Sequence, residues 1–325
     1  MSSLQACAPV SRFVFEPQQV MSLLRQRIVG QEVALAAVEA QLKVLKADIS
    51  DPGRPLGVNL FMGPTGVGKT EIVRLLAQAI HGRPDALCRI DMQTLAQEHY
   101  AASLTGAPPG YVGSKEGISL FDETLIAGSY SRPGIVLFDE LEKASDQVLR
   151  SLLGILESGR LTLAGGTRTL DFRNSLIFMT SNVGAREAGQ RMRRGWRRWL
   201  ALFGESEAQV LERALHQCFE PEFLNRIDRI LMFERIEGRW LEALLDIELA
   251  RLAQRLGPQR RVQLDESARA WLIAGYDVRF GARALGRRVR VMLEPAIADC
   301  LLDADGKGDM KVTLRGERLL VTRCA

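Results

Sequence analysis

The chain of 325 residues is poor in histidine, and its cysteines are scattered. It contains 3 His and 5 Cys, with no C-x-x-C pair and no cluster of cysteine with histidine. The cysteines are Cys7, Cys88, Cys218, Cys300 and Cys324. This distribution supports neither a disulfide framework nor a zinc site, and it favours a reduced, cytoplasmic protein.

Long apolar runs and a targeting segment are also missing. No stretch of about 18 apolar residues occurs, so no transmembrane segment is expected. The first residues, Met1 to Pro9, lack the basic and apolar regions of a signal peptide. The 29 Gly and 12 Pro show no period, which excludes the collagen-like and low-complexity classes.

Charge of one sign is not in large excess, and aromatic residues are few. The 43 Lys and Arg against 39 Asp and Glu leave a net charge of +4, and aromatic residues make up 6% of the chain. This balance gives no indication of nucleic-acid binding. The remaining composition, 46% hydrophobic and 25% charged, is that of an ordinary globular protein with room for more than one domain.

Four short apolar runs alternate with helical patterns in the first part of the chain. Each run has the length of a strand and is continuously apolar, as expected for strands buried on both faces of a parallel sheet. The runs are Gly57 to Met62, Leu87 to Asp91, Gly134 to Asp139 and Ser175 to Ser181. An amphipathic helix is predicted between the first two. Strand, helix and strand in this order predict an α/β fold with a doubly wound parallel sheet.

Beyond Phe233 the pattern changes to that of a small α+β domain. The expected elements are a leucine-rich helix at 241–256, a strand at 261–264, two further helices of which the last spans 282–302, and a terminal hairpin at 310–321. Pro295 is expected to bend the last helix. The resulting division is an N-terminal tail at 1–20, a large domain at 21–234 and a small domain at 235–325.

The segment between the first predicted strand and the first predicted helix fits the phosphate-binding pattern G-x-x-x-x-G-K-[ST]. Its residues are Gly63, Pro64, Thr65, Gly66, Val67, Gly68, Lys69 and Thr70. Glycines let consecutive backbone N–H groups curl around an anion, and the following helix N-terminus adds a positive dipole. Lys69 supplies a charge for the β- and γ-phosphates of a nucleotide, and the Thr70 hydroxyl is a hard ligand for Mg²⁺.

The third predicted strand ends in two acidic residues, Asp139 and Glu140. In a P-loop sheet this strand end lies beside the metal site, so Asp139 is expected to hold Mg²⁺ together with Thr70. Glu140 is expected to orient or deprotonate the attacking water. The alternative is an acidic strand end that is merely solvated.

Taken in order, the motifs resemble those of one family, the ATPase module of the Clp unfoldase and disaggregase chaperones, a branch of the AAA+ ATPases. They are the P-loop, G-A-P-P-G-Y-V-G at 106–113, L-F-D-E-L-E-K-A at 137–144, F-R-N-S at 172–175, T-S-N at 180–182, F-L-N-R-I-D at 223–228 and G-A-R at 281–283. The resemblance covers about residues 20 to 323. It implies a P-loop AAA+ large domain followed by a small lid domain, in an ATP-driven ring that is usually a hexamer of identical subunits.

The resemblance implies roles for residues outside the P-loop. Ile28 and Val29 resemble the segment that borders the adenine, and Asn182 resembles the sensor that contacts the attacking water or the γ-phosphate. Arg283 resembles the sensor of the small domain. Arg226 resembles the arginine finger, which neutralises charge at the γ-phosphate of a neighbouring subunit. The alternatives are a strand cap for Asn182 and solvent-facing side chains for the two arginines.

The segment with Tyr111 and Val112 resembles the loop with which the family grips an extended polypeptide in the ring's channel. Glycines and prolines around Tyr111 provide a flexible yet shaped stem for an aromatic side chain. A tyrosine packed within its own subunit is the alternative. The stretch from Leu161 to Thr169 resembles the second pore loop.

The chain departs from the family in two places. It resembles an isolated second ATPase module, because only about twenty residues precede the module, and how it selects substrates is left open. Between Asn182 and Arg226 it lacks the I-G-F or I-G-L tripeptide of the peptidase-associated members, so no Clp peptidase is expected as a partner. Residues 186–203 are instead rich in arginine and tryptophan. The spacing from Arg191 to Phe203 predicts a basic amphipathic helix, which either binds an unknown acidic partner, a membrane surface or nucleic acid, or packs on its own domain.

The sequence therefore predicts an ATPase that unfolds, disassembles or translocates polypeptides through a central pore. One alternative is an ATP-dependent scaffold or adaptor that assembles without threading. A nucleic-acid remodelling ATPase is disfavoured, because the G-Y-V-G loop at 110–113 has no lysine or arginine to track phosphates.

Overall fold

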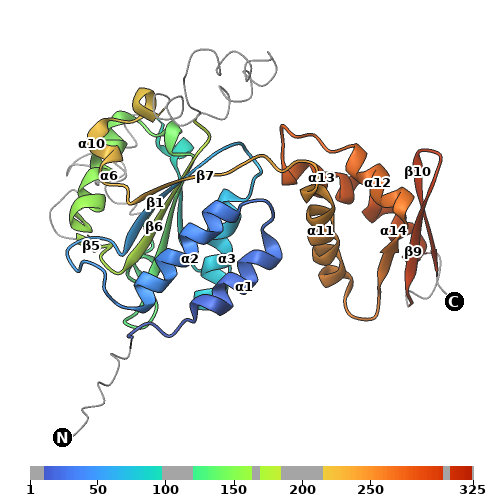
Figure 1. The fold of residues 1–325 in the computed structure, drawn as a ribbon, viewed down its shortest axis with the longest axis horizontal. Coiled ribbons are helices and arrows are strands. Elements are labelled where there is room, and N and C mark those ends of the chain that lie inside the picture. Colours follow the sequence, from blue (N-terminus) through green and yellow to red (C-terminus); the bar gives the residue numbers. More distant parts are fainter. Residues whose placement is uncertain (1–10, 97–119, 163–168, 184–214, 303–307, 324–325) are drawn as a thin grey trace, which may run out of the picture. The chain divides into compact units, whose positions relative to one another are not determined.

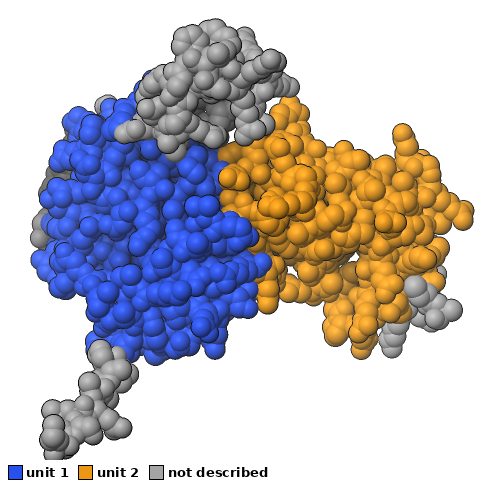
Figure 2. Space-filling model, in the orientation of Figure 1, with its two compact units in different colours: residues 1–25, 32–63, 69–233 blue, residues 26–31, 64–68, 234–325 orange. Residues whose placement is uncertain are grey.

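A computed structural model describes residues 11–96, 120–162, 169–183, 215–302 and 308–323 of the chain. The chain divides into two compact units (Figure 2). The first comprises residues 1–25, 32–63 and 69–233, and the second comprises residues 26–31, 64–68 and 234–325. The tip of the P-loop, Pro64–Gly68, therefore groups with the C-terminal residues, while Gly63 and Lys69 at its ends belong to the first unit.

The first unit is built on a five-stranded sheet of order β2-β3-β6-β1-β7 (Figure 1). Every neighbouring pair in this sheet is parallel. The strands are β1 (Gly57–Met62), β2 (Cys88–Asp91), β3 (Gly134–Asp139), β6 (Ser175–Ser181) and β7 (Arg229–Met232). Parallel strands joined through helices confirm the predicted doubly wound α/β fold, and the four apolar runs form β1, β2, β3 and β6.

Helices cover both faces of this sheet (Figure 1). α2 (Glu32–Lys46) and α3 (Lys69–His81) lie on one side, and α6 (Asp146–Ser158) lies on the other. In the described residues, the other helical segments of this unit are α1 (Pro17–Arg27), whose last two residues group with the second unit, η1 (Met92–Leu95), α5 (Glu123–Ala127), η3 (Leu141–Lys143) and α10 (Pro221–Leu224). Two covered faces explain why the central strands are apolar along their whole length.

The core follows the alternation of side chains along the strands. Val58 and Leu60 of β1 pack in one cluster with Leu152 of α6. Phe61 points to the opposite face and lies 5.4 Å from Phe178 of β6 between ring centroids. All six residues of β1 and all six of β3 are buried, so these strands fix the position of whatever follows their carboxyl ends.

β7 is a strand that the search for apolar runs misses. Its sequence is Arg-Ile-Leu-Met, and Ile230 and Met232 remain 37% and 40% exposed at the edge of the sheet. Pairing with β1 holds it in place, and the Asp228 carboxylate just before it accepts a hydrogen bond from the Val58 N–H at 2.7 Å. An edge strand with partly exposed side chains does not need the continuous apolar run of a central one.

A short antiparallel hairpin precedes β6. It consists of β4 (Arg160–Thr162) and β5 (Thr169–Asp171). The predicted second pore loop, 161–169, begins and ends in these strands, and its residues 163–168 lie outside the described ranges.

The second unit contains a three-stranded sheet of order β10-β9-β8 and four α-helices in its described residues. Its strands are β8 (Val262–Leu264), β9 (Met310–Arg315) and β10 (Arg318–Arg323), and its α-helices are α11 (Trp240–Leu256), α12 (Glu266–Ala274), α13 (Ala282–Arg288) and α14 (Glu294–Leu302). β9 and β10 form the predicted terminal hairpin. This arrangement confirms the expected small α+β domain after the sheet domain.

The helix predicted at 282–302 changes its hydrogen-bond pattern in the middle. A π-helical turn, η4 (Val289–Leu293), joins α13 to α14, and the Glu294 N–H bonds to the Val289 carbonyl five residues back. Pro295 has no N–H to offer the carbonyl four residues before it, so the wider turn lies where the regular ladder would lack a donor. Among the described helices, none is long and apolar enough to cross a membrane.

Candidate active site

The P-loop connects β1 to α3 through a tight turn of glycines. Gly63, Gly66 and Gly68 have φ angles of 141°, 78° and 103°, which side chains with a Cβ rarely adopt. A Cβ on Gly63 would also lie 2.5 Å from the carbonyl oxygen of Phe233. The backbone conformation of the loop therefore requires glycine at these positions of the motif, and such a conformation is needed for a loop that curls around phosphate.

The Lys69 ammonium lies under this loop and is already oriented. Its side chain is buried, and its Nζ donates to the Gly63 carbonyl at 2.5 Å and to Asn182 Oδ1 at 2.9 Å. Lys69 begins α3, which follows β1, and Asn182 is the residue after β6. The two residues meet because parallel strands end at the same edge of the sheet. The structure thus brings two predicted site residues into direct contact.

Asn182 is held from its other side by Glu142, a residue that the sequence analysis does not single out. Glu142 Oε1 accepts from the backbone N–H and from Nδ2 of Asn182, both at 3.1 Å. Glu142 on one side and Lys69 on the other fix which way the Asn182 amide faces. The only sequence signal for Glu142 is its place two residues after Glu140 in the same motif.

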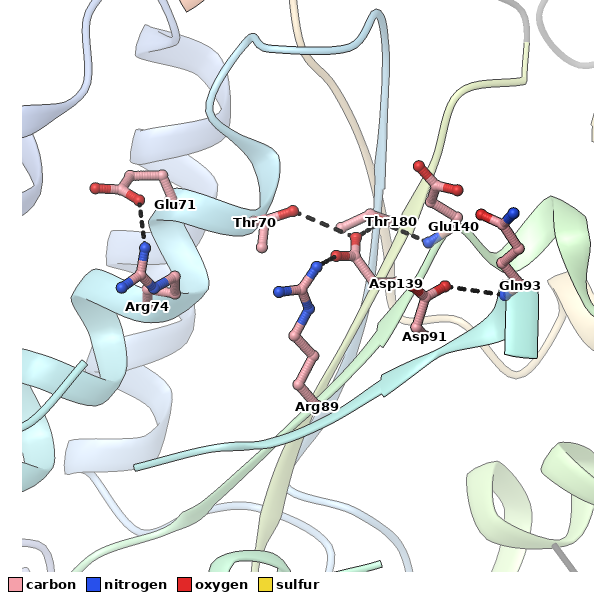
Figure 3. Close-up of polar contacts among 9 residues, drawn as sticks. All are labelled: Thr70, Glu71, Arg74, Arg89, Asp91, Gln93, Asp139, Glu140 and Thr180. Atoms are coloured by element: carbon pink, nitrogen blue, oxygen red, sulfur yellow. Dashed lines mark hydrogen bonds and ion pairs between the residues drawn. The ribbon is translucent and has the colours of Figure 1, made fainter. Parts of the chain in front are cut away.

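Three side chains converge on the Asp139 carboxylate at the end of β3 (Figure 3). The Thr180 hydroxyl donates to Oδ1, and the Thr70 hydroxyl donates to the same oxygen at 3.3 Å. Arg89 of β2 donates to Oδ2 at 2.6 Å. Asp139 itself is 6% exposed, so this carboxylate is buried and paired. Thr70 and Asp139, the predicted metal ligands, are therefore neighbours, whereas Thr180 and Arg89 come from the structure alone.

Glu140 faces a different direction from its neighbour (Figure 3). Its backbone is left-handed, with φ 58° and ψ 51°, and its N–H donates to Thr180 Oγ1 at 3.0 Å. Non-glycine residues rarely occupy this region, and such strain concentrates at functional sites. In the part of the chain that the structure describes, no hydrogen bond or ion pair is formed by the Glu140 carboxylate. It is thus available to act on a water.

The predicted adenine segment lies next to the P-loop in the second unit. Ile28 is buried, and its Cδ1 would lie 3.4 Å from a Cβ on Gly68. Val29 packs against the core cluster of this unit. Gln31, whose side chain is 3% exposed, donates to the Glu234 carbonyl at 2.8 Å and to the Val67 carbonyl at 3.4 Å. Its Oε1 accepts from the Glu234 N–H at 3.0 Å, so this glutamine fastens the segment to the loop tip.

The two predicted arginines lie in different units. Arg226 follows α10, and its exposed guanidinium donates to Glu157 of α6 at 2.8 Å. Arg283 is exposed in the first turn of α13, and the described residues offer it no hydrogen bond or ion pair. Asp228, two residues after Arg226, pairs with Arg54 at 2.8 Å. Within the described ranges, Arg226 forms no hydrogen bond with the P-loop of its own chain.

Two predicted functional segments are not described by the structure. Tyr111 and Val112 of the predicted pore loop lie within 97–119, outside the described residues. The arginine- and tryptophan-rich segment 186–203, including Arg191 to Phe203, lies within 184–214 and is likewise outside them.

The residues at the edge of the sheet fit ATP with Mg²⁺. The described residues contain no group of three or more His, Cys, Asp or Glu that would hold a metal ion by themselves. Mg²⁺ in phosphate-binding sites does not require one, since phosphates and water complete its octahedron beside one or two hard protein oxygens. The Thr70 hydroxyl and the Asp139 carboxylate are such oxygens, and they are hydrogen-bonded to each other at the N-terminus of α3.

A phosphate loop after β1, an acid pair after β3 and an asparagine after β6 together define the site of a P-loop nucleotide-binding protein. Comparison of the sequence with protein-family models narrows this class. Residues 54–230 match the family described as AAA domain (Cdc48 subfamily), and residues 238–314 match the C-terminal, D2-small domain of ClpB protein. The chain belongs to the AAA ATPases of the Clp type.

Individual relatives agree with this assignment. The chain is 50% identical over 313 residues to the ATP-dependent protease ATP-binding subunit-like protein AmiB of Pseudomonas aeruginosa, covering 93% of this chain and 84% of that protein. It is 42% identical over 316 residues to an ATP-dependent protease ATP-binding subunit-like protein of Rhodococcus erythropolis, covering 94% and 89%. It is 37% identical over 311 residues to the ATP-dependent Clp protease ATP-binding subunit ClpC of Staphylococcus aureus, of which it covers 37%.

Proposed function

We propose that this chain is a ring-forming ATPase that unfolds, disassembles or translocates polypeptides through a central pore. The observation that carries the proposal is the convergence of Lys69, Asn182 and the Asp139–Glu140 pair at the carboxyl edge of one parallel sheet. Membership of the Clp-type AAA ATPases, whose relatives are named as ATP-binding subunits, supports ATP as the nucleotide.

Each side chain of the site has a task that its environment supports. Lys69 and the P-loop backbone bind the phosphates, and Ile28 and Val29 border the adenine. Thr70 and Asp139 would hold Mg²⁺, which when bound neutralises phosphate charge. Asn182, oriented by Glu142, positions the attacking water or the γ-phosphate.

Glu140 is the general base in this proposal. Its carboxylate has no partner among the described residues and leaves the strand in a different direction from Asp139, so a proton acceptor and a metal ligand are provided by adjacent residues. A positioned base of this kind contributes roughly 10²- to 10⁴-fold to the rate.

Assembly would complete the site. The Arg226 side chain is 40% exposed, and among the described residues it forms a surface ion pair with Glu157. A neighbouring subunit's γ-phosphate is therefore a stronger partner for it than the carboxylate that it contacts here. Arg283 would approach the nucleotide from the small domain. A homo-hexameric ring is proposed because the family is typically oligomeric and the sequence resembles members that usually form hexamers.

Polypeptide is the proposed substrate, gripped by Tyr111 and Val112, and nucleic acid is disfavoured. An ATP-dependent scaffold that assembles without threading is the second candidate, and it shares every residue of the ATP site. The test is the native mass of the purified chain with ATP and Mg²⁺, together with its ATP turnover with and without an unfolded polypeptide. Polypeptide-stimulated turnover by a hexamer supports the proposal, unstimulated turnover supports the scaffold, and absence of turnover contradicts both.

No Clp peptidase is proposed as a partner, although relatives carry names that contain the words ATP-dependent protease. The segment 186–203 contains arginines and tryptophans where the docking tripeptide would lie, and unpaired guanidinium groups oppose entry into an apolar pocket. This segment is a candidate contact for another, acidic partner. Incubation of the chain, ATP, an unfolding substrate and a Clp peptidase tests the point, since ATP-dependent peptide release above the peptidase-only rate would refute it.

A further inference from the structure

Arg89 stands beside the proposed metal ligand without a role in the mechanism described above. Its Nη2 donates to Asp139 Oδ2 at 2.6 Å, and the two side chains are 53% and 9% exposed. The cation therefore reaches from solvent onto a buried carboxylate oxygen. Figure 3 shows the guanidinium approaching Asp139 from the side of Thr70, whose hydroxyl is the other proposed metal ligand.

The strand register explains why Arg89 points there. β2 pairs with β3 so that Arg89 is opposite Leu137 and Asp91 is opposite Asp139. Side chains two residues apart share a face of the sheet, so Arg89, Leu137 and Asp139 all lie on the same face. A long side chain at position 89 reaches diagonally along this face to the end of β3.

The ion pair between Arg89 and Asp139 opposes the binding of Mg²⁺ to Asp139, because both cations need the same carboxylate. Asp139 attracts either a guanidinium or Mg²⁺ with its hydration shell, and the two cations repel each other at a separation well below the roughly 8 Å Debye length. The hydroxyls of Thr180 and Thr70 occupy Oδ1, so Oδ2 is the oxygen for which the two cations compete.

We propose that Arg89 is a positioning residue that holds the Asp139 carboxylate in place when metal is absent and competes with Mg²⁺ for it. Arg89 thereby sets how strongly nucleotide binding depends on Mg²⁺. This inference rests on the proposed ATP site and adds a residue to it.

The test compares nucleotide affinity with and without metal, so it does not require turnover. The dissociation constant of ATPγS is measured in EDTA and in Mg²⁺. The ratio of the constant in EDTA to the constant in Mg²⁺ reports how much the metal strengthens nucleotide binding. In Arg89→Met, which keeps the length of the side chain and removes its charge, this ratio is expected to rise about three- to ten-fold. An unchanged or smaller ratio would overturn the proposal, and a smaller one would mean that Arg89 assists the metal site.

A matched control lies on the adjoining helix. The side chain of Arg74 in α3 is 51% exposed, and its Nη1 lies 3.6 Å from Oε2 of Glu71. The Glu71 carboxylate is separate from that of Asp139 (Figure 3). Arg74→Met should leave the ratio unchanged, whereas Arg89→Lys, which restores a cation, should return it toward the wild-type value. Failure of the lysine variant to lower the ratio relative to Arg89→Met would count against competition between charges.

The outcomes also separate this inference from the proposed function. If the wild-type chain binds ATPγS neither in EDTA nor in Mg²⁺, the ATP site itself is wrong. If it binds the nucleotide in Mg²⁺ and the ratio is the same in Arg89→Met, the ATP site stands and only the role of Arg89 is wrong.

Discussion

At the level of single residues, the proposed mechanism assigns metal binding and proton transfer to two adjacent side chains. Asp139 is buried and hydrogen-bonded through Thr70 and Thr180, whereas the carboxylate of Glu140 has no partner within the described ranges. Thr180 connects the two, since its hydroxyl donates to Asp139 and accepts from the Glu140 N–H. The strained backbone of Glu140 keeps its carboxylate away from that of Asp139.

This separation predicts the behaviour of Glu140→Gln. Nucleotide binding should be retained, because Lys69, Thr70 and Asp139 are untouched, while ATP turnover should fall at least about 10²-fold, because the water loses its base. Turnover is measured by phosphate release and binding by nucleotide titration of the same preparation. Wild-type turnover in this variant would show that another group takes the proton.

Glu142 gives a second prediction at this scale, because it holds Asn182 by two hydrogen bonds. In Glu142→Ala the Asn182 amide can rotate, so turnover should fall about ten-fold, the loss expected when a bond to a charged group is removed, with nucleotide affinity changed little. Lys143→Ala, at an exposed position of the same 3₁₀ turn, is the control. Equal turnover in the Glu142→Ala and Lys143→Ala variants would contradict the orienting role of Glu142.

At the level of elements, α10 and the turn after it present Arg226 at the surface of the first unit. The Arg226 N–H bonds to the Phe223 carbonyl at 3.1 Å, and the Arg226 carbonyl accepts from Arg54 at 3.4 Å. The backbone is therefore fixed while the guanidinium is exposed. Such a geometry suits a side chain that acts on a neighbouring subunit.

Arg226→Ala should consequently lose about 10³-fold in turnover although its own P-loop is intact. Mixed assembly with Lys69→Ala subunits, which retain Arg226, should restore part of the activity, because the intact P-loop of an Arg226→Ala subunit then meets the Arg226 of a Lys69→Ala neighbour. Arg150→Ala, another exposed arginine of the same unit, should remain active. If verified mixed rings stay inactive, the finger is a different residue.

β2 provides an independent check of the fold. Cys88 at its start is buried, and burial raises the pKa of its thiol to about 11. At pH 8 only about one thiol in a thousand is then the reactive thiolate, so native Cys88 should be alkylated far more slowly than the exposed Cys218. Peptide mass mapping after iodoacetamide treatment measures both rates. Equal labelling of the two cysteines would place β2 outside the core.

How much of this fold the sequence predicts depends on the kind of element. The central strands and the helix after the P-loop are predictable because burial on both faces demands continuous apolar runs and burial on one face demands a helical period. β7 is not, because an edge strand depends on pairing with β1 rather than on its own composition. The π-helical turn at 289–293 is also not predictable from the sequence, since a proline predicts an interruption of the helix without specifying its geometry.

The site divides in the same way. Lys69 belongs to one local motif, and Asp139 and Glu140 belong to another. The spacing within each motif carries the chemistry, so the sequence alone predicts roles for these residues. Glu142, Gln31 and Arg89 act through partners that lie 40, 203 and 50 positions away along the chain. Only the strand order of the sheet and the course of the chain bring such pairs together, and no local pattern encodes them.

At the scale of the whole molecule, the account requires ATP turnover to be coupled to work on a polypeptide. The P-loop site by itself supports any ATP-driven switch. Tyr111 is the residue proposed to transmit that work, and the tetrapeptide G-Y-V-G at 110–113 contains no lysine or arginine that would bind nucleic acid. Coupling is therefore the property that distinguishes the proposed unfoldase from a scaffold.

The most direct test measures ATP turnover and loss of fluorescence of a tagged fluorescent protein in the same sample, for the wild-type chain and for Tyr111→Ala. The account predicts that the wild type consumes ATP and unfolds the reporter, whereas Tyr111→Ala keeps its basal turnover within a few-fold and no longer unfolds it. Glu140→Gln is the control that should do neither. Steady ATP turnover by wild-type rings without unfolding of this tagged reporter would contradict the central claim.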